Sequence, residues 1–106
     1  MKNDDNGAQI WSDWLDFGDH DIVSSTVPDQ AGVFKVHASM KILYIGSSVN
    51  LKQSLLECMP DPCVGKAKRF SYLITKNHEV VKDQILSAFR ESHGGKLPSC
   101  MDSQQI

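Results

Sequence analysis

Two short glycine-containing runs include the tyrosine of this sequence best placed to transfer a proton or donate a hydrogen bond in a site. The first is Gly32-Val33-Phe34, and the second is Tyr44-Ile45-Gly46, which continues through two serines to Asn50-Leu51. Two β-rich runs joined by a short polar turn predict a hairpin. An Asn that can cap a following helix predicts a helix directly after the second run. The phenol of Tyr44 is a candidate base or hydrogen-bond donor.

This pattern resembles the GIY-YIG nuclease domain, whose two namesake tripeptides lie on adjacent antiparallel strands and help to build a phosphodiester-cleaving site. The resemblance covers residues 28 to about 90 and includes Pro28 before the first tripeptide. It implies a β-β-α-β-α core and places Phe34, Tyr44 and Ser54 at family active-site positions. The nearest match to the family's metal-binding glutamate is Asp83.

The chemistry of the family is only partly present at these positions. Phe34 has no hydroxyl group, and Ser54 stands where the family has an arginine, so the cation that steadies the phosphate is missing. Cys58 falls near the position of a family histidine. We therefore predict a GIY-YIG-like domain that has lost nuclease activity and binds nucleic acid or a protein partner. The alternative is an active endonuclease with Tyr44 as base and Asp83 or Glu79 holding Mg2+ or Mn2+.

The same residues also have purely structural explanations. Gly32 and Gly46 suit close backbone approach at strand ends. Tyr44 fits a half-buried strand position, and Ser54 fits an exposed helix position. His37 is a possible substitute base, although a surface strand histidine is the simpler explanation.

The charges are unevenly distributed along the chain. Residues 1–31 contain one lysine and seven aspartates, a net charge of −6, whereas residues 32–76 carry seven cations and two acids, a net charge of +5. A basic segment around the motif is typical of a phosphate-facing surface, although a solvated mixture of charges explains it equally well. The candidate nucleic-acid-binding residues, for DNA or RNA, are Lys35, Lys52, Lys66, Lys68 and Arg69.

Apolar periodicity predicts a small α+β (α/β) domain with a three-stranded antiparallel sheet flanked by helices. Ile10, Trp14 and Phe17 share one helical face, which predicts an N-terminal helix over residues 10–17; the two tryptophans (Trp11 and Trp14) are an alternative docking surface for a protein. Strands are expected over residues 33–38, 42–45 and 70–75, and helices from Asn50 to Met59 and from Asn77 to Gly94. We expect a disordered start (1–8), a helix and connection packing on the domain (9–27), the domain itself (28–93) and a tail (94–106).

Composition indicates an ordinary globular protein. Hydrophobic residues make up 41% of the chain and charged residues 23%, and no apolar run is long enough to cross a membrane. The three cysteines, Cys58, Cys63 and Cys100, leave at least one thiol unpaired and match no disulfide framework. We therefore expect reduced cysteines in an intracellular protein, cytoplasmic or nuclear; a zinc site that adds His78 or His93 is a weaker alternative.

Overall fold

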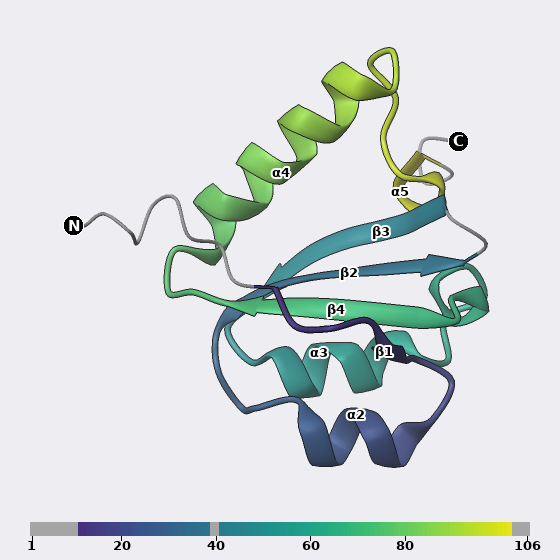
Figure 1. The fold of residues 1–106 in the computed structure, drawn as a ribbon, viewed down its shortest axis with the longest axis vertical. Coiled ribbons are helices and arrows are strands. Elements are labelled where there is room, and N and C mark those ends of the chain that lie inside the picture. The colour runs from purple at the N-terminus through teal and green to yellow at the C-terminus, as the bar shows by residue number, and fades with distance from the viewer. Residues whose placement is uncertain (1–10, 39–40, 103–106) are drawn as a thin grey trace.

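A four-stranded antiparallel sheet lies at the centre of the fold, with helices on both of its faces (Figure 1). The structure is a computed structural model that describes residues 11–38 and 41–102. The strands are β1 (Leu15–Asp16), β2 (Gly32–Ala38), β3 (Lys41–Ser48) and β4 (Arg69–Ile74), in the order β1-β4-β2-β3. The helices are α2 (His20–Thr26), α3 (Leu51–Cys58), α4 (His78–Ser92) and α5 (Ser99–Asp102), with a 3-10 turn, η1 (Val64–Lys66).

The predicted hairpin is confirmed as β2 and β3, and its alternation decides which side chains face which helices. Phe34 pairs with Gly46, and Val36 pairs with Tyr44. Because side chains alternate across a strand, these residues share the face that α2 and α3 cover. Phe34 and Val36 join Leu51 in the hydrophobic core on that face.

Local capping explains the two helices on this core face. Asn50 accepts a hydrogen bond from the Gln53 amide through its side-chain oxygen (3.0 Å), which begins α3 as predicted. Asp19 begins α2 in the same way, accepting from the Asp21 amide at 2.9 Å. The prediction treated residues 19–30 as a connection only, yet α2 buries Val23 and is followed by buried Val27, which is an i, i+4 spacing.

The long helix α4 lies on the opposite face of the sheet, where it contacts β2 and β3. Unlike α3, it has no fully buried residue. It ends as predicted at two glycines with positive φ, Gly94 (+65°) and Gly95 (+87°), and the Gly95 amide donates to the Arg90 carbonyl at 2.7 Å. This is the hydrogen bond that closes a helix with a left-handed glycine after its last turn.

The predicted N-terminal helix is wrong, and so is the three-stranded sheet. Residues 11–14 form no helix, and β1 follows them as a fourth strand on the free edge of β4. The Ser12 amide donates to the Tyr72 carbonyl at 2.8 Å, and the Ser12 hydroxyl accepts from the Tyr72 amide at 3.1 Å. Pairing with an open strand edge satisfies the backbone of this segment, which outweighs its helical apolar spacing. Ile10 lies outside the described residues.

The C-terminal segment packs on the domain, although the prediction treated it as a tail. Pro98 and Cys100 are buried, and α5 contacts β3. Cys63 and Cys100 form a disulfide across 37 residues of sequence, which corrects the expectation of reduced cysteines; Cys58 is the free thiol. The intracellular location stays a prediction, since disulfides persist mainly in oxidising compartments. Within the described ranges, every helix is too short or too polar to cross a bilayer.

Candidate functional site

The two motif glycines are explained by close packing. A Cβ atom on Gly46 would lie 2.7 Å from both the Phe34 and the Tyr44 ring, and one on Gly32 would collide with the Leu73 carbonyl oxygen. Contacts this short are not available to a side chain. The structural explanation of these two glycines is therefore sufficient for the pattern that the sequence shows.

The aromatic residues of the two tripeptides lie in or against the core. Phe34 is only 2% exposed, and its ring centroid lies 5.9 Å from that of Tyr44. Burial raises the pKa of the Tyr44 phenol, and the negative charges of the Cys58 thiolate and the Asp61 carboxylate raise this pKa further. A phenol with a raised pKa stays protonated at neutral pH and is a poor base. Tyr44 can still donate a hydrogen bond.

Ser54 takes part in the hydrogen bonds that join β3 to α3. Its hydroxyl lies 2.5 Å from the Ser48 hydroxyl, which in turn donates to the Asn50 carbonyl at 2.8 Å and accepts from the Asn50 amide at 2.9 Å. All of these bonds are local to the strand-to-helix turn. Ser54 thus has a structural task at the position where the resemblance implies a phosphate-binding arginine.

Asp83 does not lie on the same face of the sheet as Tyr44. It is exposed on α4, and α4 covers the face of the sheet opposite to the one that holds Phe34, Tyr44 and α3. Over the ranges that the structure describes, no three His, Cys, Asp or Glu side chains gather into a metal-binding group. The residues around Tyr44 therefore do not fit the Mg2+ or Mn2+ ion that the resemblance implies, and no reaction step is derived through one.

The predicted nucleic-acid-binding residues separate into different parts of the molecule. Lys52 lies near the start of α3 and forms an ion pair with Asp29 (3.5 Å). Lys35 lies on the α4 face of the sheet, with its ammonium 4.2 Å from the centre of the Trp11 ring and 5.4 Å from that of Trp14. Burial lowers the pKa of the Lys35 ammonium. Lys35 and Lys52 therefore each interact with other side chains of the fold.

The remaining predicted cations meet at the other end of the sheet. Lys68 donates its backbone amide to the His37 carbonyl (3.0 Å), and Arg69, which forms an ion pair with Asp16, pairs with His37 in the sheet. The disulfide holds η1 and its terminal Lys66 next to α5. At this same end β3 begins, and the chain returns from α4 to α5 (Figure 1). We call this region the basic end, defined by Lys41, Lys66, Lys68, Arg69 and Lys96.

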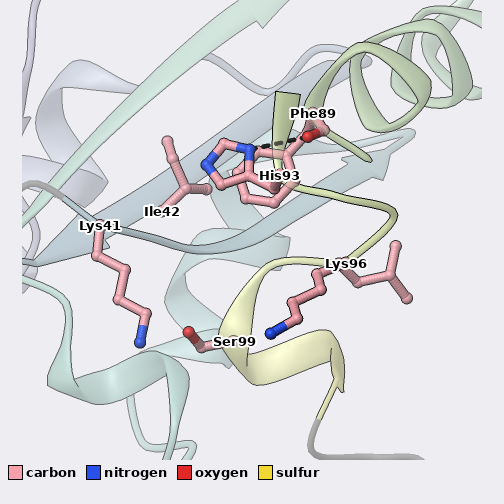
Figure 2. A pocket seen from close by; sticks show the side chains of 7 residues that line it. Lys41, Ile42, Phe89, His93, Lys96 and Ser99 are labelled. Carbon is pink, nitrogen blue, oxygen red and sulfur yellow. Dashed lines mark hydrogen bonds between the residues drawn. The ribbon is translucent and has the colours of Figure 1, made fainter. Parts of the chain in front are cut away.

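A cavity of about 430 Å³ opens at the basic end, between the start of β3 and the segment that leads from α4 to α5. Figure 2 shows the ammonium groups of Lys41 and Lys96 on either side of the Ser99 hydroxyl. The other lining side chains are Ile42, Phe89, His93 and Leu97. These seven described residues combine two cations and a hydroxyl with an apolar and aromatic wall, and none of the seven is acidic.

Sequence reasoning missed this cavity because its parts are distant along the chain. Lys41 entered only the charge count, while Lys96 and Ser99 fell in the segment expected to be a tail. The residues between Gly94 and Cys100 carry no motif that indicates a site. A pairing of Cys63 with Cys100 is the one signal that would have placed them beside the sheet.

Comparison of the chain with models of protein families, with curated proteins and with solved structures finds no match. The resemblance to the GIY-YIG domain therefore depends on the two tripeptides and on the order of the elements that follow them.

Proposed function

We propose that this protein is a GIY-YIG-like binding module that holds nucleic acid through its phosphates at the basic end and does not cleave it. The observation that carries the proposal is that five cations from separate segments lie at one end of the sheet. Lys41 and Lys96 line one hollow there, while Lys68 and Arg69 line another together with Asp16 and Asp19. Phosphate contacts supply most of the affinity of proteins that bind nucleic acids without reading sequence.

The cations of the basic end are available to a ligand. Lys41, Lys66, Lys68 and Lys96 are exposed and form no ion pair with any residue in the described ranges. Arg69 is the exception, because Asp16 neutralises it in part. These four lysines can make as many as four phosphate contacts. Lys52, at the far end of the sheet, differs because it forms an ion pair with Asp29.

The other family positions support the proposed absence of cleavage. A phosphodiesterase needs a base, a cation at the phosphate and, as a rule, a metal held by carboxylates. Here Phe34 is in the core, Ser54 bonds to Ser48, and Asp83 lies on the opposite face of the sheet. These features support binding without hydrolysis.

The proposal is tested by fluorescence anisotropy with labelled single-stranded and duplex DNA and RNA over a series of salt concentrations. We expect log Kobs to fall with log salt with a slope of about −2 to −4, as two to four phosphate contacts require. The double variant Lys66→Gln/Lys68→Gln is expected to reduce this slope by about 1 to 2. The matched control is Lys52→Gln/Lys76→Gln, which removes two cations from the far end and leaves the slope unchanged.

Two results would overturn the proposal. Absence of salt-dependent binding to every nucleic acid would leave a protein as the partner. Cleavage in the presence of Mg2+ or Mn2+ that disappears in Tyr44→Phe would show an active nuclease with a rearranged site.

A further inference from the structure

The lining of the cavity at the basic end has a polar part and an apolar part. Its polar part is formed by the two lysine ammonium groups and the Ser99 hydroxyl, and its apolar part by Ile42 and Leu97. A volume of about 430 Å³ falls within the range of small-molecule sites in proteins. An internal phosphate of a nucleic-acid strand can bind to an open surface patch. A cavity, in contrast, can enclose the terminal group of such a strand.

Charge favours a dianion in this cavity. A phosphate monoester carries a charge of about −1.5 to −2 at neutral pH, whereas an internal phosphodiester carries only one negative charge. Lys41 and Lys96 supply two compact positive charges, and Ser99 supplies a hydroxyl donor. All three groups line the same cavity, and in the view of Figure 2 the Ser99 hydroxyl lies between the two ammonium groups.

The aromatic wall favours a planar group attached to that phosphate. The Phe89 and His93 rings are stacked, with centroids 3.8 Å apart and planes 7° apart. His93 Nδ1 lies 2.8 Å from the Phe89 carbonyl oxygen, which can only accept, so this nitrogen donates the hydrogen bond. The bond fixes the ring in place and leaves Nε2 for a ligand. A nucleobase can lie against such a wall, since aromatic stacking tolerates any base.

We infer that this cavity binds a nucleoside monophosphate: the phosphorylated terminal nucleotide of a strand, or the free nucleotide. The phosphate lies between Lys41 and Lys96 on the Ser99 hydroxyl, and the nucleoside lies along Ile42 and the Phe89–His93 pair. This inference rests on the proposed function and deepens it, because it assigns a preference for phosphorylated ends. It involves binding alone and no bond is made or broken.

The inference is tested by calorimetric titration with adenosine 5′-monophosphate, adenosine 3′-monophosphate and adenosine. The expected result is binding of at least one monophosphate and none of adenosine. Lys41→Gln and Lys96→Gln should each weaken that binding by about tenfold, the loss of one charge-assisted hydrogen bond. Ser99→Ala keeps both charges and should weaken it less. Lys76→Gln is the control outside the cavity, and thermal melting confirms that each variant is folded.

A second arm uses one oligonucleotide with a 5′-phosphate, a 3′-phosphate or two hydroxyl ends, measured by anisotropy, and so distinguishes a strand end from a free nucleotide. Equal affinity for all three forms, with no binding of either monophosphate, would overturn the inference while leaving the proposed function intact. Binding of a monophosphate without binding of any oligonucleotide would support the cavity and refute the nucleic-acid function. Failure of every ligand would overturn both.

Discussion

The tyrosine side of the sheet and the basic end differ in how their polar and aromatic groups are used. On the tyrosine side, Phe34 packs in the core, and the hydroxyl of Ser54 is satisfied within the fold. At the basic end, Lys41 and Lys96 form no ion pair within the described ranges and line a cavity. Side chains that complete a core contribute to stability, while charged groups left without partners are available for a ligand. The tyrosine side, which carries the sequence motif, is thus the region whose polar groups are less available to a ligand.

The largest change in stability is expected from the variant Phe34→Ala on the tyrosine side. Removing a buried aromatic side chain leaves a cavity, and we expect the free energy of unfolding to fall by about 3–5 kcal/mol. Urea denaturation measures the change. Val49→Ala is the control, because Val49 is 77% exposed. A loss below about 1 kcal/mol would mean that Phe34 is not a core residue.

The second effect concerns the covalent link of the basic end. Cys63→Ser/Cys100→Ser opens a loop whose cysteines are 37 residues apart, which is expected to lower stability by about 2–4 kcal/mol. The double variant should also weaken nucleotide binding, since the disulfide holds the segment that carries Lys96 and Ser99 near β3. Adding reductant to the original protein should have the same effect, and adding it to the double variant should have none. Unchanged stability after reduction would contradict the disulfide.

A third prediction tests whether the motif glycine serves packing. In Gly46→Ala the new methyl group would lie 2.7 Å from two aromatic rings, so we expect a loss of about 1–3 kcal/mol. Gly18→Ala is the matched control, because nothing lies within 4 Å of its added Cβ. Chemical denaturation of both variants measures the difference. Equal stability of the two would show that the rings move aside freely.

The smallest effect is expected from Ser54→Ala. The variant loses one hydrogen bond to Ser48, which contributes about 1 kcal/mol to stability. Nucleic-acid affinity should not change, since the basic end is elsewhere. Ser87→Ala on the exposed side of α4 is the control. A loss of affinity in Ser54→Ala without a loss of stability would return the binding site to the tyrosine side.

The core elements of the fold could be predicted because their signals are local. Alternating side chains specify β2, Asn50 begins α3, and Gly94 ends α4, each through contacts within a few residues. The helix α2 was missed, although Asp19 and the spacing of Val23 and Val27 are local signals of the same kind. For β1 no local signal exists, because the free edge of β4 decides whether residues 15–16 extend along it.

The sequence by itself determined the hairpin, the helix after it, and the lack of a hydroxyl group at Phe34 and of a positive charge at Ser54. The tertiary structure alone decided which cations share a surface. Lys35 and Lys52 lie close in sequence to the motif but are taken up by tryptophan rings and by Asp29, whereas Lys41 and Lys96 meet across 55 residues at one cavity. The physical reason is that secondary structure depends mainly on residues near one another in the sequence. A binding site depends on segments that are distant in the sequence, and here strand pairing and the Cys63–Cys100 disulfide bring those segments together.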